Sequence, residues 1–139
     1  MMYEPNERKI NISQLENKFL KPSTELLTLL IDDTDHSCIG GFLCAQRGMY
    51  NKIKHSAYIV IGMLKQYGHK GYGTNMFKLL DKWAISNNIT RLELTVVSEN
   101  INAVQLYEKV GFKKEGIKKN SLIIDGKYAD EFYMSKILL

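Results

Sequence analysis

A glycine-rich turn between a strand pattern and a helix pattern contains the residue types that bind a phosphate group. It occupies residues 68–74 and reads Gly-His-Lys-Gly-Tyr-Gly-Thr. An apolar run precedes it, and apolar residues at helical spacing follow it. Such a turn presents unpaired backbone N–H groups and the positive end of a helix dipole to an anion. Gly71 and Gly73 let that anion approach the backbone closely, although a glycine turn before a helix is also often only a turn.

Two familiar phosphate-binding motifs do not fit the spacing of this turn. A dinucleotide fingerprint requires a third glycine at the position that Met76 occupies. A P-loop requires lysine and then serine or threonine after its last glycine, but Thr74 and Asn75 follow Gly73. These mismatches argue against NAD and nucleoside triphosphates, and they leave some other phosphate-bearing ligand.

Length and charge indicate a single globular domain over residues 1–139. The net charge is +4 and the basic residues are dispersed, which suits an anionic ligand better than a nucleic-acid partner. The longest apolar runs are shorter than a membrane span, so we expect no membrane partner. The histidines and cysteines lack metal-ligand spacing, and we expect no metal site. Cys38 and Cys44 are too far apart along one strand to form a disulfide, and free thiols fit the cytoplasm.

The elements that position the glycine turn are predicted from hydrophobic periodicity and capping residues. Strands are expected at residues 24–31, 38–46, 55–64, 91–97, 112–124 and 127–138. A capping box of Ser13 with Glu16 predicts a first helix that Pro22 ends. Two more helices are expected at residues 73–86 and 103–110, with an acidic turn at 32–37 and a tight hairpin turn at 125–126. The strand–helix–strand order around residues 73–86 predicts that strands 55–64 and 91–97 are parallel.

A second motif follows the strand at residues 91–97. Residues 100–112 read Asn-Ile-Asn-Ala-Val-Gln-Leu-Tyr-Glu-Lys-Val-Gly-Phe. Together with Gly71-Tyr72-Gly73 and the hairpin around Asp125-Gly126, this motif resembles the GNAT family of N-acetyltransferases over roughly residues 25–139. The glycine turn is similar to the family's pyrophosphate loop, and residues 100–112 match its N-x-x-A-x-x-L-Y-x-x-x-G-F signature. The C-terminal part further resembles bacterial members that acetylate amino acids, polyamines or ribosomal-protein N-termini.

The resemblance implies a fold, a reaction and a set of residues. The implied fold is α+β in three layers, with a mixed, mostly antiparallel central sheet and flanking helices. The implied reaction moves an acetyl group from acetyl-CoA directly to a primary amine of a small molecule or a protein N-terminus, without an acyl-enzyme. The positions that correspond to the family's cofactor contacts are Ile61, Gly62, Met63, Gly68, His69, Lys70, Gly71, Tyr72, Gly73, Thr74, Asn100 and Asn102. Tyr107 matches the tyrosine that protonates the departing thiolate.

Acetyl transfer also needs a group that takes a proton from the acceptor. An alkyl ammonium has a pKa near 10.4, so only about one molecule in a thousand is free amine at pH 7. Glu93 is our first candidate for this base, because it lies on the strand beside the central one. The alternative is that Glu93 faces solvent or pairs with Arg91. Tyr107 has an alternative role as well, since its spacing from Ala103 suits a core aromatic residue.

The sequence departs from the family pattern in two places. Gly68 and His69 stand where the pyrophosphate loop usually has arginine or glutamine and then a small residue. One side-chain contact to phosphate is thereby lost, and His69 or Lys70 replaces it in part. Family members also begin with a strand and a helix before the Ser13 segment, and we expect this chain to lack both. The exposed sheet edge would then favour pairing with a second copy of the chain, as a homodimer.

The acceptor and the alternative functions stay open at this point. Acceptor selectivity is expected from the loop at residues 47–54, the Ser13 helix and the final hairpin. Asp130 and Glu131 in that hairpin either attract a cationic amine or are ordinary strand-surface acids. The main alternative function is a GNAT-like module that binds CoA without catalysis, and turnover with any amine separates the two. A nucleic-acid-binding domain is a third class, which the dispersed charge disfavours.

Overall fold

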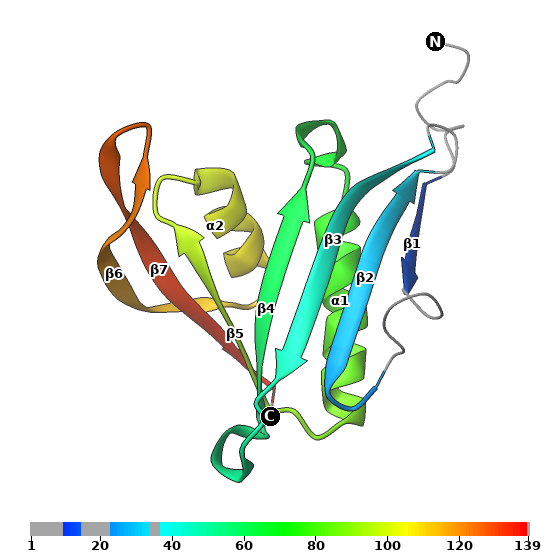
Figure 1. Cartoon of the computed structure of the whole chain (residues 1–139). Coiled ribbons are helices and arrows are strands. Elements are labelled where there is room, and N and C mark those ends of the chain that lie inside the picture. Colours follow the sequence, from blue (N-terminus) through cyan, green and yellow to red (C-terminus); the bar gives the residue numbers. More distant parts are fainter. Residues whose placement is uncertain (1–9, 15–22, 34–36, 139) are drawn as a thin grey trace.

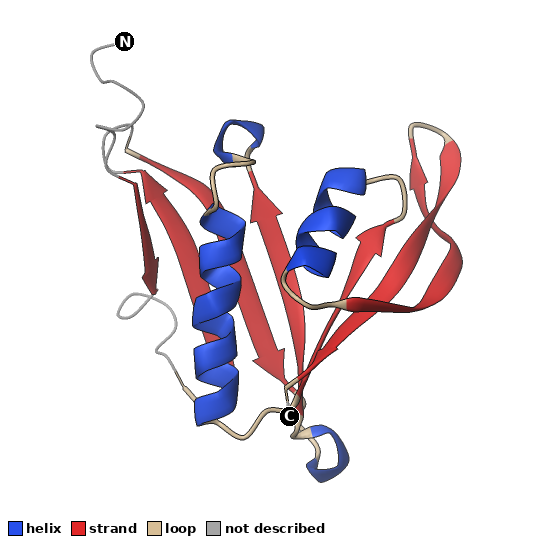
Figure 2. Cartoon of the chain, turned by 180° about the vertical axis from the view of Figure 1, so that it is seen from behind, coloured by secondary structure: helices blue, strands red, loops and turns tan. Residues whose placement is uncertain are grey.

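The computed structural model describes residues 10–14, 23–33 and 37–138, which form one sheet with helices on one of its faces (Figures 1 and 2). The sheet has seven strands in the order β1-β2-β3-β4-β5-β7-β6. The strands are β1 (Ile10–Gln14), β2 (Leu26–Asp33), β3 (Cys38–Arg47), β4 (Ser56–Met63), β5 (Arg91–Val97), β6 (Lys113–Ile124) and β7 (Lys127–Ile137). The helices are α1 (Tyr72–Ser86) and α2 (Ile101–Lys109), with two 3₁₀ turns, η1 (Asn51–Ile53) and η2 (Lys65–Tyr67). Every strand pair is antiparallel except β4 with β5, so the predicted mixed α+β sheet is confirmed.

The core lies between the sheet and the two helices, which cover the same face (Figure 2). Strand β5 turns one face toward this core, because Leu92, Leu94 and Val96 are buried and alternate with residues that are less buried. Helix α1 packs Phe77 and Leu80 against this apolar surface. Truncating fully buried residues of this kind to alanine typically costs about 2–5 kcal/mol of stability. The opposite face of the sheet carries no helix among the described residues.

Three predictions about the N-terminal part are wrong at the residues that the structure describes. Ser13 lies in β1 and pairs with Leu30 of β2, so strand pairing overrides the local capping pattern that predicted a helix there. The rest of that predicted helix falls in residues 15–22, outside the described residues. The sheet edge beside β2, which was expected to be bare, is occupied by β1. Asp32 and Asp33 extend β2 opposite Ile39 and Cys38 instead of belonging to the turn.

Three further predictions are confirmed: the parallel pairing of the two central strands, the tight hairpin turn and the free cysteines. Strands β4 and β5 are parallel, and the Asp125-Gly126 hairpin has positive φ at both positions, 51° and 76°. Cys38 and Cys44 are free thiols. Neither described helix has the length and apolarity needed to cross a bilayer. In the described ranges, no group of three or more potential ligands is arranged to hold a metal ion.

Candidate active site

Strands β4 and β5 are joined only at their beginnings. Ser56–Tyr58 pair with Arg91–Glu93, and beyond these residues the two strands diverge (Figure 1). Residues 59–63 of β4 continue to pair with β3 on the other side. The edge of β4 that faces the gap therefore carries backbone N–H and C=O groups that no described strand uses. An extended ligand can bond to this edge as an added strand would.

The glycine turn follows directly from the open end of β4. The η2 turn ends at Gly68, and α1 begins after Gly71, which has a φ of 85° and gives the helix no side-chain cap. The first N–H groups of α1 are thus left for a ligand. A Cβ at Gly71 would meet nothing within 4 Å, so the turn faces open space. Gly73 serves another purpose, because a Cβ there would lie 2.8 Å from the end of the Leu106 side chain of α2, which would have to shift.

A cleft of about 690 Å³ joins the end of β4, the glycine turn and α2. All the residues predicted to bind the cofactor line it except Lys70: Ile61, Gly62, Met63, Gly68, His69, Gly71, Tyr72, Gly73, Thr74, Asn100 and Asn102. Segments that are far apart in the sequence therefore meet at one cleft. Asn100 also caps α2, since its side-chain oxygen accepts a hydrogen bond of 3.3 Å from the N–H of Ala103. Lys65 and Lys109 add positive charge to the lining.

Tyr107 of α2 lines the same cleft and is also part of the aromatic core. Its side chain is 7% exposed, and its ring meets Phe77 edge-on at a centroid distance of 5.8 Å. Phe112 lies 6.2 Å from the same ring. Burial raises the pKa of Tyr107 to about 12. At neutral pH the hydroxyl is therefore protonated and is able to donate a hydrogen bond.

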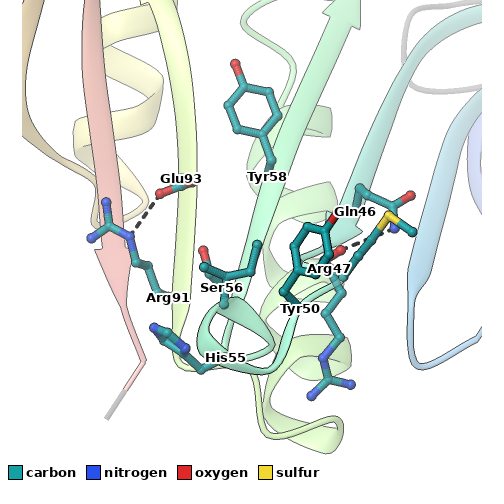
Figure 3. A pocket seen from close by; sticks show the side chains of 11 residues that line it. Gln46, Arg47, Tyr50, His55, Ser56, Tyr58, Arg91 and Glu93 are labelled. Atoms are coloured by element: carbon teal, nitrogen blue, oxygen red, sulfur yellow. Dashed lines mark hydrogen bonds and ion pairs between the residues drawn. The ribbon is translucent and has the colours of Figure 1, made fainter.

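Glu93 lines a different pocket, of about 440 Å³, on the helix-free face of the sheet (Figure 3). The pocket lies where β4 and β5 begin, and the loop between β3 and β4 forms its other wall. Its lining consists of Gln46, Arg47, Gly48, Met49, Tyr50, Ile53, His55, Ser56, Tyr58, Arg91 and Glu93. The two predicted catalytic residues are thus not brought into one pocket. His55 is exposed and directly precedes β4.

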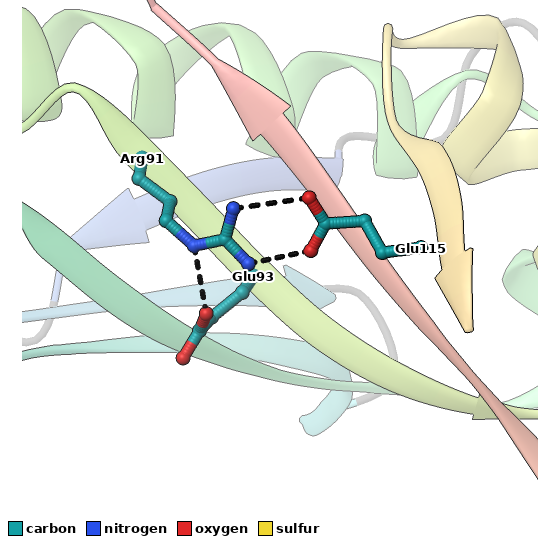
Figure 4. A network of polar contacts seen from close by, with 3 residues as sticks. All are labelled: Arg91, Glu93 and Glu115. Atoms are coloured by element: carbon teal, nitrogen blue, oxygen red, sulfur yellow. Dashed lines mark hydrogen bonds and ion pairs between the residues drawn. The ribbon is translucent and has the colours of Figure 1, made fainter. Parts of the chain in front are cut away.

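Arg91 holds Glu93 and a second carboxylate in one network (Figure 4). The Arg91 Nε donates to Glu93 Oε2 at 3.0 Å, and its two Nη atoms donate to Glu115 at 2.6 and 3.1 Å. The Arg91 guanidinium lowers the pKa of Glu115 to about 2. The same bonds raise the pKa of Arg91, with Glu115 as the larger cause. The pairing of Glu93 with Arg91, which the sequence left as an alternative to catalysis, is therefore present.

Sequence reasoning missed Tyr58, which lies where the two strands separate. Its hydroxyl is 2.9 Å from Oγ1 of Thr95 on β5. A signal was available, because alternation places Tyr58 and Thr95 on the face opposite the buried Ile59 and Leu94. What the sequence could not supply was the register that sets Tyr58 opposite Glu93, two residues before Thr95.

The two acids of the final hairpin make local contacts at the surface. Asp130 accepts hydrogen bonds from the N–H of Asn120 and from Lys119, and the Asn120 bond is the main cause of its lowered pKa. Glu131 accepts a hydrogen bond from Ser121. These contacts fix the irregular part of the β6–β7 pairing, between Lys118 and Leu122. They match the interpretation of both residues as ordinary strand-surface acids.

Comparison with known proteins gives one family. A model of the acetyltransferase (GNAT) domain matches residues 4–133. The L-amino acid N-acetyltransferase AaaT of Escherichia coli strain K12 is 36% identical over 62 residues, which are 45% of this chain and 36% of that protein. The spermidine N(1)-acetyltransferase of Vibrio cholerae is 29% identical over 128 residues, 91% of this chain and 72% of that protein. A solved GNAT acetyltransferase from Streptococcus pneumoniae has a TM-score of 0.76 and 29% identity, covering 84% of this chain and 69% of that chain. The aligned segments thus span about a third of the first relative and about seven tenths of the other two.

Proposed function

Because the chain belongs to the GNAT acetyltransferase family, we propose that it transfers the acetyl group of acetyl-CoA to the primary amine of a small molecule. This proposal rests on the two features that the larger cleft joins. The cleft connects the unpaired edge of β4 with the uncapped N-terminus of α1. An extended amide-containing arm that ends in phosphate groups fits both features, since one offers strand-like hydrogen bonds and the other favours an anion.

Backbone groups make most of the proposed cofactor contacts. Ile61, Gly62 and Met63 offer their main chain to the arm, and Asn100 and Asn102 approach it from α2. The amides of Tyr72, Gly73 and Thr74 receive the diphosphate at the positive end of the α1 dipole. His69 and Lys70 are exposed on the turn and replace part of the side-chain contact that the missing arginine or glutamine would make to phosphate. Lys65 and Lys109 contribute further positive charge along the cleft.

Tyr107 assists the departure of the thiolate by donating a hydrogen bond. Acetyl-CoA supplies a thioester, whose carbonyl carbon bonds to the amine nitrogen while its bond to sulfur breaks. A thiol has a pKa near 8.5, about 3.5 units below that of Tyr107, so full proton transfer from the phenol is uphill by about 5 kcal/mol. A hydrogen bond to the developing negative charge carries no such cost. The buried hydroxyl is well suited to this part because it stays protonated throughout the neutral range.

We assign the acceptor amine to the smaller pocket and its proton to Glu93. Tyr58, which lines this pocket, lies three residues before Ile61 of the larger cleft, roughly 10 Å along β4. The amine and the thioester would then meet where β4 and β5 separate. Glu93 attracts the ammonium group and accepts its proton, directly or through water. Arg91 already occupies one of its carboxylate oxygens, which predicts a moderate catalytic contribution.

The lining of the smaller pocket favours an acceptor with one ammonium group and an apolar body. Met49, Tyr50 and Ile53 form an apolar wall, and each of these side chains is exposed to the pocket or to solvent. Glu93 is the single carboxylate of the lining, and Arg91 already neutralises part of its charge. A polyamine with several ammonium groups therefore finds few partners. Of the acceptors implied by the relatives, an apolar amino acid fits better than spermidine.

Cellular setting and assembly are part of the same proposal. We place the protein in the bacterial cytoplasm, because its cysteines are free thiols and the relatives named above come from bacteria.

We also infer a homodimer, since the outer strand β6 exposes Ile117 and Ile123 at 55% and 68%. Sedimentation at several concentrations tests this, and a monomer at every concentration would contradict it.

Calorimetry and a turnover assay together test the proposed function. Acetyl-CoA is titrated into the chain, and release of free CoA thiol is then followed with apolar amino acids, spermidine and a short peptide as acceptors. Micromolar binding with turnover of an amino acid is the expected result. Binding without turnover of any amine would instead support the CoA-binding module, and the absence of both would overturn the proposal.

A further inference from the structure

A buried carboxylate and a buried phenol meet beneath the glycine turn, and the proposed reaction uses neither. Asp33, at the end of β2, is 0% exposed, and Tyr67, in η2, is 2% exposed. The Tyr67 hydroxyl donates a hydrogen bond of 2.6 Å to Oδ2 of Asp33 and lies 3.3 Å from Sγ of Cys38. The bond to Asp33 is the main cause of the raised pKa of Tyr67, followed by the contact with Cys38 and by burial. The phenol is thus held in its protonated form as a permanent donor.

The ring of Tyr67 occupies space that a glycine leaves free. A Cβ at Gly40 of β3 would lie 2.8 Å from two ring carbons of Tyr67, so the ring rests directly on the backbone of β3. The N–H of Leu64 donates to the carbonyl of Gly40 at 2.9 Å, just before η2 begins. On the other side, Tyr72 at the start of α1 lies 6.3 Å from the Tyr67 ring, centroid to centroid. Tyr67 is therefore fixed from both sides.

The turn that follows Tyr67 has little to hold it in place by itself. Gly68 closes η2 with a bond to the carbonyl of Lys65, and His69 and Gly71 then have positive φ values of 59° and 85°. A non-glycine residue such as His69 adopts this conformation only at a cost. Such a turn takes its shape from its two ends. One end is helix α1, and the other is Tyr67, which also lines the cofactor cleft.

We propose that Asp33 and Tyr67 are positioning residues that hold the glycine turn in the conformation that receives the phosphate groups of the cofactor. The identity of that ligand rests on the proposed function, whereas the restraint on the turn is a property of the free chain. The end of β2 then controls cofactor affinity through one hydrogen bond, without contacting the cofactor. Neither residue takes part in the chemical step, so the effect belongs to cofactor binding and not to the turnover of bound substrates.

Tyr67→Phe is the central variant, because it removes only the hydroxyl and keeps the ring between Gly40 and Tyr72. We expect the Kd for CoA, measured by calorimetry, to rise about tenfold, which is about 1.4 kcal/mol. The KM for acetyl-CoA should rise in parallel, while kcat and the KM for the amine stay within about twofold. Amide hydrogen exchange in the free protein should become faster at residues 65–74. Asp33→Asn, which keeps one acceptor oxygen, should give a smaller change, and the double variant should bind CoA no more weakly than Tyr67→Phe.

Thr28→Val is a matched control on the same strand. Thr28 is 9% exposed and its hydroxyl lies 3.8 Å from Sγ of Cys44, away from the turn. This variant should lower the melting temperature while leaving CoA affinity and exchange in the turn unchanged. If Tyr67→Phe behaves in the same way, Tyr67 only stabilises the fold and the proposal is wrong. Should Tyr67→Phe fail to fold, Gly40→Ala replaces it, since its Cβ displaces the ring and is expected to weaken CoA binding in the same direction.

Failure of the proposed function is distinguishable from failure of this inference. If the unmodified chain binds no CoA, the proposed function is wrong, and hydrogen exchange alone decides the inference. Faster exchange confined to residues 65–74 in Tyr67→Phe supports the restraint on the turn. Exchange that matches the unmodified chain overturns it.

Discussion

The hydroxyl of Tyr58 lies 2.9 Å from Oγ1 of Thr95, and this hydrogen bond spans β4 and β5 where they separate. Tyr58 is 42% exposed and lines the pocket that contains Glu93. In the proposed reaction, the thioester reaches this point from the larger cleft and the amine reaches it from the smaller pocket. We therefore expect this bond to hold β4 and β5 together at the point where the two ligands would meet.

Removing the Tyr58 hydroxyl is expected to slow acetyl transfer without weakening cofactor binding. Tyr58→Phe should lower kcat/KM for the amine about tenfold, because the two strands are no longer tied together beside the reacting atoms. The Kd for CoA should not change, since Tyr58 does not line the larger cleft. Steady-state kinetics and calorimetry measure the two quantities. Tyr128→Phe, in the final hairpin and 68% exposed, is the control, and equal rates in both variants would contradict this role of Tyr58.

A charge at Gly71 is expected to abolish cofactor binding. Gly71→Glu introduces a carboxylate where the diphosphate would rest and adds strain, because φ is 85°. Gly126→Glu is a matched control, since Gly126 has a φ of 76° and, like Gly71, has nothing within 4 Å of an added Cβ. Both variants should lose about 1–2 kcal/mol of stability from backbone strain, as measured by urea unfolding. Only Gly71→Glu should raise the Kd for CoA by more than about a hundredfold, and equal affinities in the two variants would refute the phosphate site.

Local sequence patterns predicted the helices and strands around the cleft, because hydrophobic periodicity, glycine placement and capping residues determine where these elements begin and end. The β4–turn–α1 segment follows from hydrophobic period and glycine placement, and the position of Asn100 as the cap of α2 follows from its side chain. The predicted cofactor residues converge because each lies at the end of such an element. Most of the residues that line the cleft could therefore be predicted from two short motifs.

Pairing between distant segments determined what the sequence did not reveal. Ser13 has the local pattern of a helix cap, but its pairing with Leu30 places it in a strand. Asp33 looks like a turn residue, but Tyr67, far along the chain, provides a donor that allows its burial. Glu93 and Tyr107 were predicted to work together, and strand alternation and helix position send them to different pockets. Each of these outcomes depends on a register or contact that no local window contains.

The reaction rate should not fall at high pH through ionisation of Tyr107. The pKa of Tyr107 is about 12, so the hydroxyl remains a donor at every pH below about 11. Tyr107→Phe should lower kcat about tenfold or more at all these pH values, with little effect on the Kd for CoA. Kinetics from pH 6 to 10 test this. A full rate for Tyr107→Phe would leave the residue with its packing role beside Phe77 alone.

The raised pKa of Tyr107 should also make the free energy of unfolding decrease at alkaline pH. An unfolded tyrosine ionises near pH 10 and the native Tyr107 near pH 12, so above pH 10 the unfolded chain loses its proton first. The contribution of Tyr107 is thus complete below pH 10 and falls by about 2–3 kcal/mol as pH rises to 12. Urea unfolding should show a smaller loss over this range in Tyr107→Phe than in the unmodified chain. Equal losses would indicate that the native phenol ionises as an exposed one does.

Glu115 should stabilise the fold only above acidic pH. Its pKa falls from 4.5 to about 2 in the folded chain, so the stabilisation is present above pH 4.5 and is lost as pH falls toward 2. The side chain is 42% exposed, and solvent screening limits the contribution to less than about 1 kcal/mol. Glu115→Gln should therefore be slightly less stable than the unmodified chain at pH 7 and equally stable at pH 2. A difference that persists at pH 2 would point to packing in place of charge.

Glu93→Gln tests whether the carboxylate beside Arg91 takes the proton from the acceptor amine. We expect kcat to fall by about a hundredfold, at the low end for loss of a general base, because Arg91 already occupies one of the carboxylate oxygens of Glu93. Raising the pH should restore part of the rate, since more of the acceptor is then free amine. The Kd for CoA should stay unchanged, because Glu93 does not line the cofactor cleft.

Glu115→Gln is the control for this experiment, because Glu115 shares the Arg91 partner but does not line the acceptor pocket. It removes a carboxylate from the same network, so any effect that arises only from freeing Arg91 appears in both variants. A loss of rate in Glu93→Gln alone assigns the proton to Glu93. Equal rates in the two variants would show that Glu93 serves the ion pair only, and the base must then be sought among water and the other groups at the junction of β4 and β5.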